Sequence, residues 1–123
     1  MRPVRSLLLT VAVVVLAGCG PSKQEKADEA AAKAAEAARS EMQGRDYEEV
    51  LGASGCTGDC AGHNAGFAYA QENGIEGPST ECEDHGDSFD EGCAAYGQVI
   101  DQCVEAAREA VMQNKDPAGH CPG

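Results

Sequence analysis

The sequence predicts an all-α protein, in which an Ala-rich spacer helix precedes a small disulfide-stapled helical domain. Residues 20–45 consist mostly of alanine and charged residues, which are strong helix formers. Between residues 88 and 113, apolar side chains recur every three or four positions, as on a helix with one buried face. No segment alternates apolar and polar residues in the manner of a half-buried strand. Six of the 7 cysteines lie beyond residue 55, in a segment too small to build a large core.

The N-terminus has the features of an export signal. Arg2 and Arg5 supply positive charge without a nearby acid, and residues 6–18 are apolar or small. This run is long enough for a signal-peptide core but shorter than the ~20 residues that span a bilayer. Leu16-Ala17-Gly18-Cys19 closes the run and resembles the lipobox of bacterial lipoproteins. The resemblance implies that residues 1–18 are removed and that Cys19 is lipidated. The alternative is a simply secreted protein in which Cys19 is structural.

The lipobox resemblance also implies a location. Gly20 follows the lipid-bearing cysteine, where an Asp commonly marks retention in the inner membrane. We therefore expect an outer membrane lipoprotein in a diderm bacterium, facing either the periplasm or the surface. In a monoderm bacterium, the same protein would lie on the outer face of the cytoplasmic membrane. Acylated Cys19 would provide the contact with the lipid bilayer.

Residues 19–45 are predicted to be the lipidated cysteine followed by a helical tether. Ser22 is a suitable N-cap, and Glu25 completes a capping box. Gly44 is a fitting stop. Because large apolar residues are nearly absent before Met42, we expect a semi-rigid spacer about 30 Å long that buries little area. An alanine coiled coil or a helix that contacts the cell wall is the alternative.

Residues 46–123 form the predicted acidic Cys-rich domain. They carry two basic side chains against 16 acidic ones, whereas residues 20–45 carry five of each. This charge opposes binding to nucleic acid and to anionic lipid headgroups. It favours cations or a basic partner.

An even number of cysteines in a small exported domain indicates a disulfide framework. These cysteines are Cys56, Cys60, Cys82, Cys93, Cys103 and Cys121. Three bridges at ~2–4 kcal/mol each would compensate for a thin core. Cys56 and Cys60 are four residues apart at a helix start, so we expect each of them to reach Cys82 or Cys93 instead. An antiparallel helix pair would alternatively bring Cys60 near Cys103. Six cysteines allow 15 pairings, which the sequence leaves open.

The first helix of this domain is predicted over residues 60–73. Asp59 is the expected N-cap, and Gly74 is a C-terminal stop after which Ile75 packs back on the last turn. Gly62 and Gly66 lie four residues apart on this helix and are expected to admit a second helix at close range. Residues 74–87 form an acidic loop.

The second helix is predicted to begin at Ser88, with Glu91 completing a capping box. It ends before Asp116-Pro117, and a short tail over residues 118–123 carries Cys121. Its expected apolar face consists of Cys93, Tyr96, Ile100, Cys103, Ala107 and Val111.

Residues 56–75 (CTGDCAGHNAGFAYAQENGI), together with Cys82 and residues 88–96 (SFDEGCAAY), resemble a small Cys-rich module. This module occurs near the ends of assorted exported bacterial proteins and has no assigned activity. The resemblance therefore implies no catalytic residue. It implies that the first four of these cysteines form one unit, so that Cys103 and Cys121 are a private third pair.

Metal binding is the first alternative chemistry. Cys60-x2-His63 and Cys82-x2-His85 could supply four zinc ligands, although thiols outside the cytoplasm tend to oxidise. Six carboxylates lie within residues 81–91, which makes a Ca²⁺ site conceivable. Their spacing lacks the alternation of an EF-hand loop, and helix-start acids explain them equally well. We expect no bound cofactor or metal.

Enzymatic chemistry has little support. Cys56-x3-Cys60 lacks the spacing and βαβ context of a redox motif, so a structural bridge is favoured. The histidines, including His120 in the tail, accompany no nucleophile-elbow motif. We expect a non-enzymatic, membrane-anchored envelope protein that contacts another envelope protein or the cell wall. The alternative is an extracytoplasmic metal-binding (zinc or calcium) or thiol-redox protein.

Overall fold

The computed structural model describes Gly18, residues 20–119 and Cys121. The rest of the predicted signal segment, Cys19 and His120 lie outside the described residues. Four α-helices follow in order: α1 (Lys23–Met42), α2 (Tyr47–Leu51), α3 (Ala61–Asn73) and α4 (Asp87–Met112). Single 3₁₀ turns are η1 (Ala53–Gly55) and η2 (Thr80–Cys82). The described part of the chain contains no strand, which confirms the all-α prediction.

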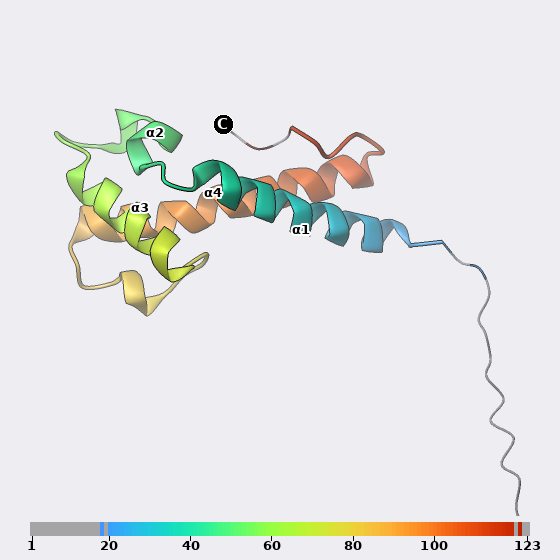
Figure 1. Cartoon of the computed structure of the whole chain (residues 1–123), viewed down its shortest axis with the longest axis horizontal. Coiled ribbons are helices and arrows are strands. Elements are labelled where there is room, and N and C mark those ends of the chain that lie inside the picture. The colour runs from blue at the N-terminus through green and yellow to red at the C-terminus, as the bar shows by residue number, and fades with distance from the viewer. Residues whose placement is uncertain (1–17, 19, 120, 122–123) are drawn as a thin grey trace, which may run out of the picture.

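Helix α4 is the central helix, since α1 runs along one part of it and α3 packs against its N-terminal half (Figure 1). Phe67 of α3 is fully buried at the centre, and its ring meets that of Tyr96 edge-on at 5.5 Å between centroids. Tyr47 of α2 meets the same Phe67 ring from another direction, at 6.2 Å. The core is thus small but contains specific aromatic contacts.

Helix α1 starts as predicted but packs differently from a free spacer. Ser22 Oγ accepts from the Glu25 amide at 3.1 Å, and the Glu25 carboxylate accepts from the Ser22 amide at 2.6 Å. The inward face along α4 is formed by Ala27, Ala31, Ala35, Ala38 and Met42, all buried. Small side chains let the two helices approach closely, so a sequence without large apolar residues still contributes to the core. Most of the segment over residues 19–45, which was expected to be a tether that buries little area, is therefore packed against the rest of the molecule.

Helix α3 begins one residue later than predicted. Cys60 occupies the N-cap position, and Asp59, the predicted N-cap, accepts only from the Ala61 amide, at 3.3 Å. The C-terminus is confirmed: Gly74 is left-handed with φ 65°, and the amide of buried Ile75 donates to the Ala70 carbonyl at 2.9 Å.

Glycines bring α3 and α4 together at backbone distance. A Cβ at Gly66 would overlap the backbone of Phe89 and Cys93, and one at Gly92 would overlap the backbone of His63. A Cβ at Gly62 would approach Ser88 Cβ to 2.7 Å. The predicted close approach at Gly62 and Gly66 is confirmed.

Helix α4 begins at Asp87 without the predicted capping box. Gly86 is the N-cap, and no side chain caps the first turn. The capping box at Ser88 is wrong because the carboxylate of Glu91 bonds to His63 on α3 instead. At the other end Asn114 has φ 58°, and the Lys115 amide donates to the Ala110 carbonyl at 2.8 Å.

Each of the three disulfides joins two cysteines that follow one another in the order of cysteines along the chain. The bridges are Cys56–Cys60, Cys82–Cys93 and Cys103–Cys121, with Cα–Cα distances of 5.4, 5.8 and 4.6 Å. The expectation that Cys56 and Cys60 reach Cys82 or Cys93 is wrong, as is the alternative of Cys60 near Cys103. Cys56 lies in a loop before α3 rather than on the helix, so the chain can fold back to bridging distance.

Candidate functional site

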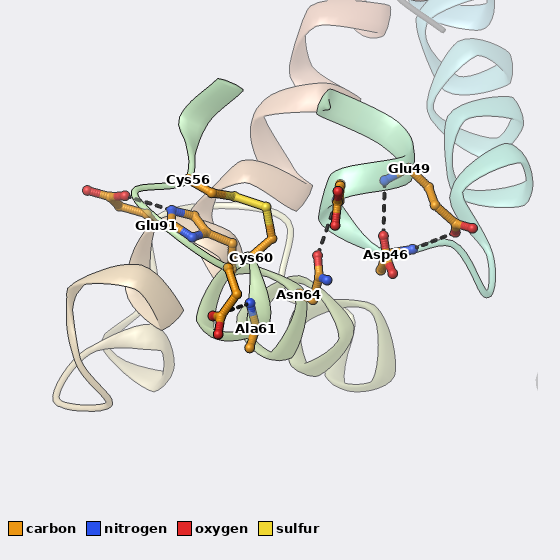
Figure 2. Close-up of a disulfide and its surroundings, with 10 residues drawn as sticks. Asp46, Glu49, Cys56, Cys60, Ala61, Asn64 and Glu91 are labelled. Atoms are coloured by element: carbon orange, nitrogen blue, oxygen red, sulfur yellow. Dashed lines mark hydrogen bonds and ion pairs between the residues drawn. A yellow bond between two sulfur atoms is a disulfide. The ribbon is translucent and has the colours of Figure 1, made fainter. Parts of the chain in front are cut away.

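A disulfide and a hydrogen-bonded histidine–carboxylate pair lie at the N-terminal end of α3 (Figure 2). Cys60 is the N-cap of α3, and the short loop before it carries its disulfide partner Cys56. His63 lies in the first turn of the helix, and Glu91 reaches it from α4. We call Cys56, Cys60, His63 and Glu91 the α3 N-terminal cluster.

His63 is the buried member of the cluster. His63 is 4% exposed, and its Nε2 lies 3.0 Å from Glu91 Oε2. The Glu91 side chain is 68% exposed, so the carboxylate remains in contact with water. A carboxylate can only accept, so Nε2 is the donor of this hydrogen bond, and in the neutral form of the ring Nδ1 is the nitrogen that carries the lone pair. Nδ1 is buried and has no hydrogen-bond partner among the described residues.

Helix α2 holds the His63 ring in place. The ring of Tyr47 lies over His63, with centroids 4.9 Å apart. Asn64, the next residue of α3, accepts the Glu48 amide at 3.1 Å and so ties the start of α2 to α3 (Figure 2). Asp46 and Glu49 form a reciprocal capping box on α2, with bonds of 3.0 and 3.1 Å. Helix α2 is thus tied to α3 beside His63, and the Tyr47 ring covers the His63 ring.

The structure does not assemble the alternative zinc site. Cys60 and Cys82 belong to different disulfides, so neither sulfur is a thiolate. His85 is exposed and packs against Phe89, with ring centroids 4.7 Å apart, whereas His63 is bonded to Glu91. Within residues 20–119, no three metal-ligating side chains converge.

The acidic run over residues 81–91 is likewise spread out. Glu81 lies in η2, the turn capped by Ser79, whose hydroxyl accepts a hydrogen bond from the Glu81 amide at 3.1 Å. Asp90 has one buried carboxylate oxygen without a partner in the described region, whereas Glu91 faces His63. No set of these acids comes together as a Ca²⁺ site would require.

An ion pair fastens α1 to the loop after α3. Arg39 makes two hydrogen bonds to the Glu76 carboxylate, of which Nη2 to Oε2 measures 2.8 Å. The hydrogen bond from Arg39 lowers the pKa of Glu76, and the same contact raises the pKa of Arg39. Burial raises the pKa of nearby Tyr96. This pair orients elements and lies away from the α3 N-terminal cluster.

One apolar recess of about 320 Å³ lies between α1, α4 and the C-terminal tail. Three alanines of α1 and the Cys103–Cys121 pair contribute to its walls, and Lys33 is its one charged lining residue. It has the size of a small ligand pocket but lacks the convergent polar groups that orient a ligand.

The link between His63 and Glu91 does not follow from the sequence, because the two residues are 28 positions apart and no local pattern connects them. The role of Tyr47 depends on helix α2, which the capping-box pair Asp46 and Glu49 does signal in the sequence.

No helix in the described region is long and apolar enough to cross a membrane. Comparison with known proteins finds no matching family model, no matching curated protein and no matching solved structure.

Proposed function

We propose that this chain is an exported bacterial lipoprotein, anchored through acylated Cys19, whose acidic helical body is a non-catalytic interaction module of the cell envelope. The observation that carries the proposal is the set of three disulfides in the described chain. Disulfides persist in oxidising compartments and are rare in the cytosol. Cys19 is the remaining cysteine of 7, and a lipid bond explains why it needs no partner.

The packing of α1 supports a short tether. Only residues 20–22 separate Cys19 from the first residue of α1, which is roughly 14 Å of fully extended chain. Since α1 packs along α4, the folded body would begin almost at the bilayer surface. Its negative charge would repel anionic headgroups and favour an orientation directed away from them.

The acidic surface supports a basic partner. Asp101, Glu105 and Glu109 are exposed along α4, and residues 46–123 carry only two basic side chains. Such a surface steers positively charged partners and disfavours nucleic acid. We therefore propose a basic envelope protein, or a cationic region of the cell wall, as the partner.

Metabolic labelling with a palmitate analogue in the producing bacterium tests the anchor. The wild-type protein incorporates the label, and Cys19→Ala abolishes incorporation because the acceptor thiol is lost. Ser22→Ala, which changes a nearby small polar residue and leaves the lipobox intact, retains the label. Label on Cys19→Ala, or none on the wild type, would contradict the proposal.

The metal-binding alternative has no structural observation in its favour. The thiol-redox alternative has one, at the α3 N-terminal cluster.

A further inference from the structure

The three disulfides differ in accessibility. Cys82 and Cys93 are 7% and 1% exposed, so their bridge lies in the core. Cys56 is half-buried in the connection between α2 and α3, whose residues 52–55 and 57–59 are all exposed. Its partner Cys60 is buried at the N-cap of α3. The Cys56–Cys60 bridge therefore joins a half-buried cysteine in an exposed loop to a buried cysteine at the helix start.

The buried Nδ1 atom of His63 adds a second, independent observation. His63 lies three residues after Cys60, on the same face of the first turn of α3. Side chains in a helix lean towards its N-terminus, which places a side chain at position 63 over the turn that Cys60 caps. Figure 2 shows Glu91, the partner of Nε2, at the same end of α3 as the disulfide. Nδ1 is the ring atom left without a partner in the described structure.

A buried polar atom without a partner requires an explanation, and a redox cycle supplies one. While Cys60 is in a disulfide, its sulfur has no hydrogen to donate. Once the bridge is reduced, Cys60 gains an S–H group one helical turn before the His63 ring. A new donor for the orphaned Nδ1 thus arises at this end of α3 only in the reduced state.

We propose that Cys56–Cys60 is a redox-active disulfide that exchanges with a dithiol. In the reduced state, His63 accepts a hydrogen bond from the Cys60 thiol, and Glu91 positions the His63 ring. The site recognises a pair of thiols on an extracytoplasmic protein. This activity goes beyond the proposed interaction role and does not depend on lipidation of Cys19.

The exchange proceeds through two successive displacements at sulfur. A thiolate of the partner attacks Cys56 Sγ, the Cys56–Cys60 bond breaks, and its electron pair leaves on Cys60 Sγ. Cys60 takes up a proton, and its new S–H group then donates to His63 Nδ1. The second thiolate of the partner attacks the mixed disulfide and releases Cys56 as a thiolate, which takes up a second proton. The protein gains two electrons and two protons, and the partner dithiol becomes a disulfide.

The local electrostatics assist the leaving step. The N-terminus of a helix stabilises a thiolate, and a thiol with a lower pKa leaves faster. Cys103 lies inside α4 and has neither a helix N-terminus nor a histidine one turn away. The Cys103–Cys121 bridge is thus a matched internal control, because it too joins a half-buried cysteine to a buried one.

Limited reduction of the oxidised, full exported protein tests the proposal. Dithiothreitol is the dithiol probe, and acid quenching with differential alkylation reports each cysteine by mass spectrometry. We expect the Cys56–Cys60 bridge to open about tenfold or more faster than Cys103–Cys121, with the helical circular dichroism retained. Equal or slower opening, or opening only with loss of helix, would overturn the proposal.

Variants test the roles of Glu91 and His63. Glu91→Gln changes an exposed side chain, and we expect several-fold slower reduction with the midpoint of its pH profile moved to lower pH. The matched control Glu72→Gln, on the exposed face at the other end of α3, leaves both unchanged. His63→Gln should slow the reaction in the same way. Should His63→Gln fail to fold, Glu91→Gln decides: a wild-type rate and pH profile would refute the assignment.

Discussion

Individual residues at the α3–α4 contact set how closely these helices approach. Gly66 and Gly92 have no space for a side chain, because the opposing backbone occupies it. Gly62 and Gly66 could be predicted from the sequence, since small residues four apart mark one face of a helix. Gly92 could not, because nothing local indicates which residue of α4 meets α3.

Gly66→Ala should lower the free energy of unfolding by roughly 3 kcal/mol, because the added methyl group forces the helices apart. Gly77→Ala is the control, as its Cβ would meet nothing within 4 Å. Urea unfolding followed by circular dichroism measures both variants. Equal stability of the two would show that the helices do not touch at Gly66.

The ends of helix α1 follow from its sequence, but its packing does not. Its position, its capping box and its end near Gly44 follow from local signals and agree with the structure. Its packing does not, because an alanine stripe is compatible with both a solvated spacer and a close helix contact. The choice depends on whether α4 offers a complementary surface, which is a tertiary property.

Ala31→Leu tests the packing of α1, since Ala31 is 3% exposed and faces α4. We expect a loss of about 1–3 kcal/mol in the free energy of unfolding from overpacking. Ala32→Leu, one position along and exposed, should change it by less than about 0.5 kcal/mol. A spacer free in solution would tolerate both substitutions alike.

The Arg39–Glu76 pair makes the attachment of α1 sensitive to pH. The pKa of Glu76 is lowered from its ordinary value of 4.5 by the hydrogen bond from Arg39. Its contribution to stability is therefore present above the unfolded pKa and is lost as the pH falls through the folded pKa. Because both groups are partly exposed, Glu76→Gln should cost only about 0.5–1 kcal/mol at pH 7.

The difference between wild type and Glu76→Gln should shrink as the pH falls below 4.5 and vanish once the pH lies below the lowered pKa of Glu76, as followed by urea unfolding at several pH values. Glu72→Gln should match the wild type at pH 7. A difference for Glu76→Gln that persists unchanged at low pH would mean that the charge of Glu76 is not what matters.

For the whole molecule, the sequence predicts the fold class and the need for disulfides but not the pairing of Cys56 and Cys60. Cysteine parity and the small core are global properties that composition reveals. Connectivity depends on how loops return, and the loop before α3 folds back on itself over four residues. The α3 N-terminal cluster escaped prediction for the same reason, because Glu91 joins it only through the packing of α4 on α3.

Removing the Cys82–Cys93 bridge should destabilise the molecule more than removing Cys56–Cys60. The buried bridge closes a loop of 11 residues and fixes the acidic loop to α4, so Cys82→Ala/Cys93→Ala should cost about 2–5 kcal/mol. Cys56→Ala/Cys60→Ala opens a separation of only 4 residues and should cost less. Thermal unfolding of the two double variants compares them, and the reverse order would contradict the structural role assigned to the core bridge.

The most direct test of the central claim is the intact mass of the protein isolated from its bacterium, combined with a non-reduced peptide map. We predict a mature chain that begins at Cys19, carries acyl chains there, and contains only the bridges Cys56–Cys60, Cys82–Cys93 and Cys103–Cys121. A mature N-terminus at another residue, or Cys19 found in a disulfide, would contradict it.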